Sequence, residues 1–430
     1  MSLPQPVISS RSAIFHVPVS PPVRAPLGGC RLADLTQQAR RDARLSARLI
    51  RDPVSAARSA GIALDAFELA ALHEVGATVF TLSDHELERR IRQRRRQRTG
   101  ETDAVAQVLI DYRVRVIDAT RQALARGTAS SAVLALLEHS LEEGAAWALM
   151  APCLPVIDFP AAVAGAMGDP LDRALPISVA GFLYYLGISM VDDVIDHEID
   201  ERWGGAREEQ VAMAGIALFA GLPMQAMRDS FNTDVTASRL YDCYQLFERA
   251  SYQMSLGQYM DVSAEFSART TMADCHEIIE LKTGSTGELM AALAATMGCC
   301  TGDSIAALGQ TCKSLYMAMQ IASDIHDIWG KPISPDLGNG IVTLPTLYAY
   351  HASPPGDREV YKAKLASRDW TAAGHSAMRQ YITAMGGLTF TILQAEATRQ
   401  RAIAAWSELA GEKPGRQMFE YMFEAARVIG

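Results

Sequence analysis

The chain has 430 residues, of which 49% are apolar and 21% are charged. This composition supplies a large buried core and excludes a chain that is disordered throughout. The formal net charge of −9 excludes a general nucleic-acid binder, because a phosphate backbone repels an acidic protein. Residues 1–100 differ from the rest, with 16 arginines and 9 acidic residues, so only this part has the charge for such a role.

Cysteine usage and apolar runs indicate the compartment. The seven cysteines form no Cys-x-x-Cys pair, which favours a reducing cytosol over a disulfide framework. The N-terminal stretch has prolines where the apolar core of a secretory signal would lie. The longest apolar run, Pro176 to Val191, is too short to span a bilayer, which takes about 20 residues. We therefore expect a cytoplasmic protein without a membrane span.

Three segments are expected in chain order. Residues 1–30 contain six prolines and two glycines, which is typical of a flexible tail. Residues 31–100 show helical spacing and end in an arginine-rich linker, so we expect a small helical accessory region there. We interpret the run from Arg89 to Arg98 as a solvated helix end, since no aromatic residues separate its arginines as a nucleic-acid contact would require. Residues 101–430 are almost continuously helical and lack the alternation of strands, which predicts an all-α main domain.

A first acidic cluster lies in the stretch GISMVDDVIDHEIDERWGG, directly after an apolar helical run. On a helix, Asp192 and Asp196 are one turn apart on one face, with Asp193 beside them, and like charges this close repel. A buried helix end keeps such carboxylates when cations neutralise them, and hard oxygen ligands suit Mg²⁺. The pattern predicts a metal site, and a solvated acidic helix face is the alternative.

A second acidic cluster lies in MQIASDIHDIWGKPISPDLGNGIVTLP. Asp324 and Asp327 are three residues apart on another apolar helix, Gln320 comes one turn earlier, and Lys331 follows. Between the two clusters, LKTGSTGELM places a Lys-Thr pair at the start of a further apolar helix. A lysine is a compact cation suited to a diphosphate oxygen. Both acidic helices and the lysine between them are therefore candidate site elements.

The order of these motifs resembles that of the polyprenyl (trans-isoprenyl) diphosphate synthase family over roughly residues 165–350, where a Gly257-Gln258 pair also matches. The resemblance implies an isoprenoid-synthase helical bundle with a central apolar cavity as the catalytic domain, residues 101–430. It also implies a Mg²⁺ cluster that holds the diphosphate of an allylic prenyl substrate. The implied catalytic residues are Asp192, Asp196, Asp324 and Asp327, and the implied metal ligands are these four with Asp193. The implied diphosphate-binding residues are Arg202, Lys282, Thr283, Gln320 and Lys331.

Candidate cavity-lining residues lie on the helix before the first motif. They share helical spacing and are Phe182, Tyr184, Tyr185, Gly187 and Ile188. Apolar and aromatic walls exclude water, which preserves a carbocation long enough to react. Gly187 would leave room above the aspartates while the tyrosines close the pocket deeper down, so we expect a substrate of farnesyl or geranylgeranyl size. Ordinary core packing is the alternative for each of these residues.

The chain departs from the family where a second substrate would bind. Elongating members carry a basic G-K-R-x-R-P segment before the first aspartate motif, but the corresponding LMAPCLPVIDFPAAVAGAMGDP contains no basic residue. Val191 and Ser323 replace a histidine and an aspartate of the motifs, and Ile341 stands where many members have a lysine. A second diphosphate cannot be held without cations. We therefore expect that the chain keeps the site for the allylic diphosphate and lacks the site for a second diphosphate.

Three functions remain open. The first is a class I terpene synthase that ionises the allylic diphosphate and releases a cyclic or linear terpene. The alternative is a prenyltransferase that elongates with isopentenyl diphosphate or uses another acceptor such as a peptide, since residues 51–75 loosely resemble leader-like segments of modified-peptide systems. The third is a non-catalytic subunit that binds a partner through its arginine-rich arm. The resemblance also implies a homodimer.

Overall fold

The computed structural model describes residues 31–97, 104–128, 130–196, 199, 203, 205–230, 236–298, 302–368, 371–409 and 415–429. Throughout these ranges the regular secondary structure is helical and no strand occurs, as the sequence predicts. The predicted tail of residues 1–30 lies outside the described residues.

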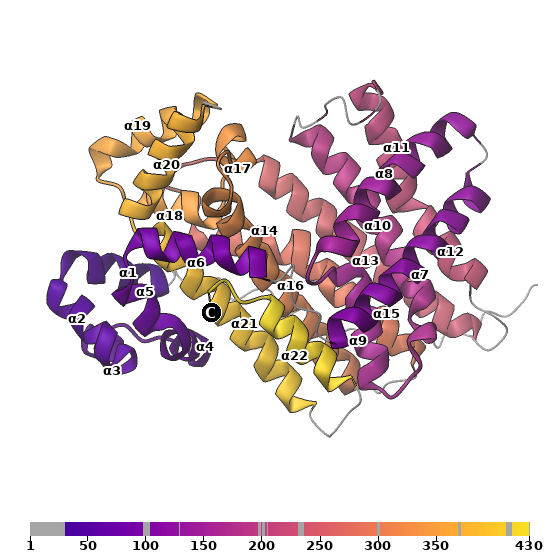
Figure 1. Cartoon of the computed structure of the whole chain (residues 1–430), viewed down its shortest axis with the longest axis horizontal. Helices are drawn as coiled ribbons and strands as arrows, with labels where there is room; N and C mark the ends of the chain where they lie inside the picture. The colour runs from indigo at the N-terminus through magenta and orange to yellow at the C-terminus, as the bar shows by residue number, and fades with distance from the viewer. Residues whose placement is uncertain are drawn as a thin grey trace, which may run out of the picture.

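The N-terminal part of the chain is a series of short helices at one end of the protein (Figure 1). They are α1 (Arg31–Arg41), α2 (Ala43–Arg51), α3 (Pro53–Ser59), α4 (Ala66–Ala71), η1 (Leu72–Gly76), α5 (Ala77–Thr81) and α6 (Asp84–Gln97). Local capping explains why they are short. Asp52 accepts a hydrogen bond from the Ser55 amide and begins α3, and Asp65 begins α4 through a capping box with Glu68.

The rest of the chain forms a bundle of longer helices in which α10, α13, α15 and α16 lie centrally (Figure 1). Its first half comprises α7 (Ala104–Gly127), α8 (Ser131–Met150), α9 (Pro155–Ala166), η2 (Leu171–Arg173), α10 (Leu175–Ile195), α11 (Glu208–Ala220), α12 (Leu222–Ser230) and α13 (Ala237–Val262). Its second half comprises α14 (Met272–Ile279), η4 (Glu280–Gly284), α15 (Ser285–Met297), α16 (Gly302–Gly330), α17 (Pro335–Asn339), α18 (Leu344–Ala352), α19 (Pro355–Ala366), α20 (Ala372–Ala384), α21 (Gly387–Glu408) and α22 (Arg416–Ala425).

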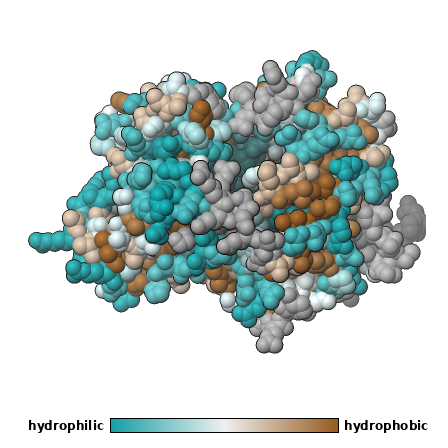
Figure 2. All heavy atoms as spheres, viewed as in Figure 1, coloured by the Kyte–Doolittle hydropathy of each residue, from teal (hydrophilic) through white to brown (hydrophobic). Residues whose placement is uncertain are grey.

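Two hydrophobic clusters fill the bundle, while hydrophilic residues cover most of the described surface on the side shown in Figure 2. The first is built mainly from α7 to α15 and from the end of the chain. The second joins the N-terminal helices to α14, α16, α18, α20 and α21, and it buries Leu35 and Leu49 together with Trp329 and Leu393. The division of the chain near residue 100 stays a prediction, but residues on both sides of it share this second cluster. The N-terminal helices thus help to hold α16, the helix that carries the second aspartate motif.

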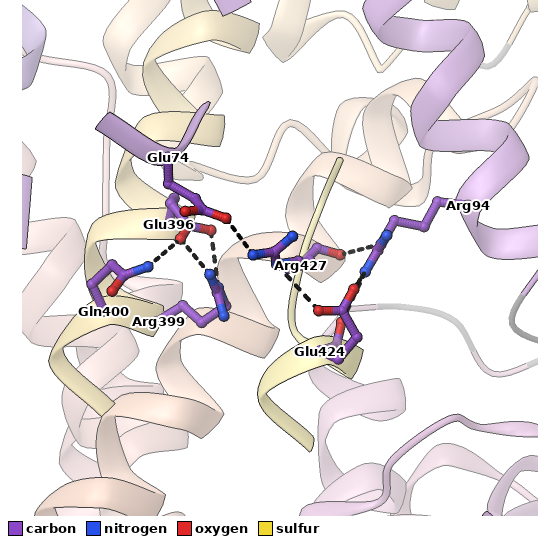
Figure 3. A network of polar contacts seen from close by, with 7 residues as sticks. All are labelled: Glu74, Arg94, Glu396, Arg399, Gln400, Glu424 and Arg427. Atoms are coloured by element: carbon purple, nitrogen blue, oxygen red, sulfur yellow. Dashed lines mark hydrogen bonds and ion pairs between the residues drawn. The ribbon is translucent and has the colours of Figure 1, made fainter. Parts of the chain in front are cut away.

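The arginine-rich helix α6 contacts the protein rather than projecting freely into solvent. The Arg92 guanidinium donates to the Trp329 carbonyl at 3.2 Å, near the end of α16. Arg94 donates to the carbonyl of Arg427 at 3.1 Å and pairs with Glu424, while Arg427 pairs with Glu74. Figure 3 shows the contacts of Arg94 and Arg427 beside the buried ion pair of Glu396 and Arg399 on α21. The expectation of a solvated helix end is therefore wrong for Arg92 and Arg94, because they satisfy carbonyls of the C-terminal half.

Two helical stretches of the described residues are long and apolar enough to cross a membrane, judged by length and composition only. They are α10, with 21 residues, and the stretch Glu208–Arg228, which includes α11 and most of α12. The expectation that the run from Pro176 to Val191 is too short is wrong, because the helix extends beyond both of its ends. Of the tested part of α10, 61% is buried inside the protein. The absence of a membrane span and the cytoplasmic location stay predictions.

The shared second cluster generates a prediction about Leu49. This side chain is fully buried, whereas the neighbouring Ile50 is 37% exposed. Leu49→Ala should lower the free energy of unfolding by roughly 2–5 kcal/mol, and Ile50→Ala, the matched control, by well under 1 kcal/mol. Intrinsic tryptophan fluorescence in urea is the measurement, because all five tryptophans lie outside residues 31–97. A tryptophan transition unchanged by Leu49→Ala would show that the N-terminal helices fold separately.

Candidate active site

One wall of the site is built where α10 ends. Asp192 accepts hydrogen bonds from the Gln258 amide at 2.7 Å and from the Lys282 ammonium at 3.2 Å. The same ammonium lies 2.8 Å from a carboxylate oxygen of Asp261 on α13. Lys282 therefore bridges carboxylates of two helices, and it is the positive charge around which this wall is arranged.

A close helix contact places these groups together. Gly257 precedes Gln258 on α13, and a Cβ atom at this position would lie 2.5 Å from the backbone nitrogen of Lys282. Only glycine lets α13 approach η4 so closely without displacing its backbone. The chain at η4 makes a π-helical turn, and Lys282 projects from it toward Asp192. The two residues of the Gly-Gln pair thus have different roles. Gly257 permits the close contact between α13 and η4, and the Gln258 amide donates a hydrogen bond to Asp192.

The opposite wall begins on α16. Asp324 is 7% exposed and accepts a hydrogen bond from the Gln320 amide at 2.9 Å. The Thr283 hydroxyl donates to the Gln320 carbonyl oxygen at 3.4 Å. Because glutamine bonds to Asp324 with one end and to Thr283 with the other, it links the second motif to η4.

The second aspartate of this motif has another task. Asp327 accepts from the Lys331 ammonium at 2.7 Å, from the Ser334 hydroxyl, and from the backbone amide of Asp336 at 3.3 Å. Ser334 caps α17 by accepting from the Leu337 amide. Asp327 therefore fixes the turn that follows α16, and this turn brings Asp336 to the pocket.

The two walls enclose a pocket of about 150 Å³, which we call the aspartate pocket. Its polar lining comes from α10, α13, η4, α16 and α17 and comprises Asp192, Asp196, Asp261, Lys282, Thr283, Gln320, Asp324 and Asp336. Its other lining comes from α14 and from the chain that enters α18 and comprises Cys275, Ile278, Ile279, Ile341, Val342, Thr343 and Leu344. A charged mouth thus adjoins an apolar side.

The carboxylates of the two walls influence one another. Burial raises the pKa of Asp324 to about 7. Burial also raises the pKa of Asp336 well above its ordinary value, and the negative charges of Asp327, Asp324 and Asp196 add to the effect. Asp196 caps the C-terminal end of α10 and lines the same pocket as Asp336 of α17, so the two walls face each other. Burial alone would lower the pKa of Lys282, but Asp192 and Asp261 outweigh it and raise that pKa.

The residues present fit a divalent cation. Five carboxylates line the aspartate pocket against one ammonium group among its described residues, and carboxylate oxygens are the ligands that Mg²⁺ prefers. The buried Oε1 atom of Gln258 has no hydrogen-bond partner among the described residues. As the described side chains stand, no three His, Cys, Asp or Glu groups converge into a ligand set. Asp192 instead holds Lys282, as expected for carboxylates that must be neutralised.

The structure brings most of the predicted site residues together. Asp192, Asp196, Lys282, Thr283, Gln320 and Asp324 all line the aspartate pocket. Asp193 lines a different pocket, on another face of α10. Asp327 and Lys331 pair with each other outside the pocket lining. Arg202 lies outside the described residues. The roles of all these residues as ligands stay predictions.

The predicted cavity-lining residues lie elsewhere. Phe182 and Tyr184 are fully buried in the first hydrophobic cluster, and Ile188 packs against that cluster. A Cβ atom at Gly187 would lie 2.6 Å from the backbone nitrogen of Phe219, so this glycine permits close packing of α10 on α11. Tyr185 lines the pocket that contains Asp193. The apolar side of the aspartate pocket is formed by α14 and the start of α18 instead.

Two pocket carboxylates escaped the sequence analysis. Asp261 lies three residues after Gln258, on the same face of α13, and this spacing was the available signal. Asp336 gave no such signal, because it follows a turn and only the contacts of Asp327 carry it to the pocket.

The raised pKa of Asp324 predicts a pH dependence of stability. Between pH 4 and 7 the folded state keeps a proton on Asp324 that the unfolded chain has lost, so without divalent cations stability falls as pH rises through this window. Asp324→Asn should remove that part of the slope and stabilise the protein at pH 8 by a few kcal/mol, at about 1.4 kcal/mol per pKa unit. Urea unfolding with EDTA at pH 5 and pH 8 measures this.

The matched control is Asp303→Asn, an exposed aspartate near the start of the same helix. It should leave the pH slope unchanged. Equal slopes for the wild type and Asp324→Asn would contradict a buried, protonated Asp324.

Comparisons with known proteins support the resemblance that the motifs carry. A geranylgeranyl diphosphate synthase of Mycobacterium tuberculosis is 27% identical over 255 residues, which cover 57% of this chain and 71% of the relative. A short chain isoprenyl diphosphate synthase of Methanocaldococcus jannaschii is 25% identical over 188 residues, or 42% of this chain. That match spans 57% of the relative's own length.

The fold is shared with solved structures. A polyprenyl synthase from Caulobacter crescentus, complexed with calcium and isoprenyl diphosphate, matches 76% of this chain and 98% of its own with a TM-score of 0.62 and 22% identity. A polyprenyl synthetase from Streptomyces coelicolor matches 75% of this chain and 99% of its own with a TM-score of 0.63 and 20% identity. These likenesses confirm the predicted all-α fold. The polyprenyl synthetase family model matches residues 161–382, which is more than half of the chain, and the protein therefore belongs to this family.

Proposed function

We propose that this protein is a Mg²⁺-dependent prenyltransferase of the polyprenyl diphosphate synthase kind, acting on an allylic prenyl diphosphate of farnesyl or geranylgeranyl size. The observation that carries the proposal is the aspartate pocket, in which five carboxylates from four helices surround one lysine. The names of the relatives favour the transferase over the terpene synthase that the sequence analysis placed first.

The pocket suggests how the residues share the work. Asp192 and Asp196 on one wall, with Asp324 and Asp336 on the other, would hold Mg²⁺. Bound Mg²⁺ neutralises a diphosphate and makes it a better leaving group. Lys282 sits between the walls and can exchange a carboxylate partner for a diphosphate oxygen.

The other residues that line the aspartate pocket would contact the rest of the substrate. Thr283 and Gln320 supply a hydroxyl and an amide beside the charged mouth. The side chains of Ile278, Ile279 and Leu344 give an apolar surface for the prenyl chain. Such a surface keeps water from an allylic cation until the acceptor reacts.

One observation favours terpene release as a second candidate. The loop between α8 and α9, residues 151–154, is where a basic segment would be expected, and it has no basic side chain. Arg113 reaches this loop but is fully buried, paired with Asp158, and it donates to the carbonyls of Ala148 and Ala151. This arginine therefore holds the loop in place and is not available to a second diphosphate.

Substrate incubation separates the candidates. The full chain is mixed with farnesyl or geranylgeranyl diphosphate and Mg²⁺, with and without isopentenyl diphosphate, and released diphosphate and products are measured. Products that form only with a second substrate support the transferase. Terpene release from the allylic diphosphate alone favours a terpene synthase. No diphosphate release in any mixture would contradict the proposal and leave a non-catalytic subunit.

A substitution tests the pocket itself. Asp192→Ala removes a carboxylate that would bind Mg²⁺ and that forms an ion pair with Lys282. It should lower turnover on the order of 10²-fold or more while circular dichroism stays unchanged. Asp303→Asn, far along α16 from the motif, is the control and should keep full activity. An active Asp192→Ala protein would remove Asp192 from the site. The homodimer stays a prediction.

A further inference from the structure

One helix of the C-terminal half, α20, contacts the turn that leads to the second wall. Residues 331–334, between α16 and α17, form no regular helix. Three side chains of α20 form hydrogen bonds with this turn or with the last residues of α16, and they are His375, Arg379 and Thr383. They are spaced four residues apart and therefore lie on one face of α20. This face thus holds the segment that leads to Asp336.

Two of these residues hold the end of α16. The Arg379 guanidinium donates to the carbonyls of Ile328 and Lys331, at 2.5 and 2.7 Å. The Thr383 hydroxyl oxygen accepts from the Trp329 indole at 2.9 Å. The last carbonyls of a helix have no partner within that helix, so an arginine that reaches them fixes the direction in which the chain leaves it.

The third residue, His375, contacts the end of the turn. The backbone amide of Ser334 donates to the Nδ1 atom of His375 at 2.9 Å, and both residues are buried. Because Nδ1 accepts this bond, the ring proton of a neutral imidazole lies on Nε2. A buried amide without an acceptor is costly, so the imidazole fixes the backbone of Ser334.

Ser334 connects His375 to the aspartate pocket. Its hydroxyl donates to Asp327 and accepts from the Leu337 amide, which caps α17. Asp327 also accepts from the backbone amide of Asp336 at 3.3 Å. Asp336 lines the aspartate pocket, whereas His375 is not among the residues that line it. Three consecutive hydrogen bonds therefore join His375 to a carboxylate-bearing residue of the pocket.

We propose that His375 is a positioning residue for prenyl transfer, which holds Asp336 in the aspartate pocket by fixing Ser334. This inference rests on the proposed function, in which Asp336 belongs to a Mg²⁺-binding wall. Position matters there because Mg²⁺ demands near-ideal octahedral geometry. Removal of a group that orients metal ligands typically weakens metal binding by roughly 10–100-fold, although the ligands themselves remain.

Open space beside His375 allows its hydrogen bond to be tested apart from its packing. The ring lines a pocket of about 470 Å³ between α17, α19 and α20 (Figure 1), so a side chain of another shape can replace it. Met378, on the same helix, is also buried and lines the same pocket, but it supplies apolar packing. Substitutions at these two positions therefore distinguish a hydrogen-bonding role from a packing role.

Two substitutions of His375 test the hydrogen bond. His375→Leu removes the acceptor, whereas His375→Asn keeps an amide oxygen near the position of Nδ1. Calorimetric titration with Mg²⁺ and inorganic pyrophosphate measures binding without turnover. We expect His375→Leu to bind them on the order of tenfold more weakly than the wild type, and His375→Asn to recover most of the loss.

The dependence of the rate on Mg²⁺ gives a second measurement. In the assay for released diphosphate, His375→Leu should need on the order of tenfold more Mg²⁺ for its half-maximal rate. It should keep most of the wild-type rate at saturating Mg²⁺, because the metal then compensates for the misplaced wall. Loss of rate at all Mg²⁺ concentrations, with unchanged binding of Mg²⁺ and pyrophosphate, would overturn the positioning role.

Met378→Ala is the matched control. It should lower the stability of the protein and leave both Mg²⁺ measurements unchanged. Equal losses in Met378→Ala and His375→Leu would overturn the assignment, and so would a loss that His375→Asn does not recover. If His375→Leu fails to fold, His375→Gln takes its place, because the longer side chain carries its amide past the position of Nδ1. Wild-type binding in His375→Gln would then overturn the assignment.

The outcomes separate this inference from the proposed function. A wild-type protein that neither binds Mg²⁺ with pyrophosphate nor releases diphosphate defeats the proposed function itself. A wild-type protein that does both, together with a His375→Leu variant that binds as tightly, leaves the aspartate pocket in place and overturns the positioning role.

Discussion

Mutual repulsion of buried carboxylates is the constraint on which the site depends. Asp192, Asp261, Asp324 and Asp336 come from four different helices and share one pocket with few positive charges among the described residues. Lys282 relieves part of the repulsion by bridging two of them. Burial raises the pKa values of Asp324 and Asp336, and the neighbouring carboxylates raise them further. A pocket with this balance attracts cations, and a cation-filled pocket attracts a diphosphate.

The fold resists this repulsion with contacts behind each wall. Gly257 lets α13 pack directly on η4, which fixes Lys282 against Asp192. Asp327 secures the turn after α16, so that Asp336 is presented by a capped helix rather than by a loose loop. Further along, Arg92 of α6 binds a carbonyl at the end of α16. The N-terminal helices thus stabilise the second wall from behind, through polar contacts and a shared core.

The sequence predicted what depends on local pattern. Helical periodicity was enough for the all-α fold, and the order of the motifs, through the family it resembles, was enough to expect Asp192 and Asp324 at one site. The apolar lining could not be predicted in this way, because periodicity shows that a face such as that of Tyr184 is buried but not which helix covers it. Asp336 reaches the pocket through a turn, and turns leave no periodic signal. The packing of α6 on α16 depends on contacts between residues hundreds of positions apart.

The central claim is that the two acidic walls jointly bind metal and diphosphate. It is tested most directly by a crystal structure of the full chain with Mg²⁺ and a non-reacting thiolo analogue of farnesyl diphosphate. The account predicts ions bound to Asp192 on α10 and to Asp324 or Asp336 on the opposite wall. It also predicts the diphosphate between them and the Lys282 ammonium turned toward its oxygens. Ions confined to one wall, or a diphosphate bound outside this pocket, would contradict it.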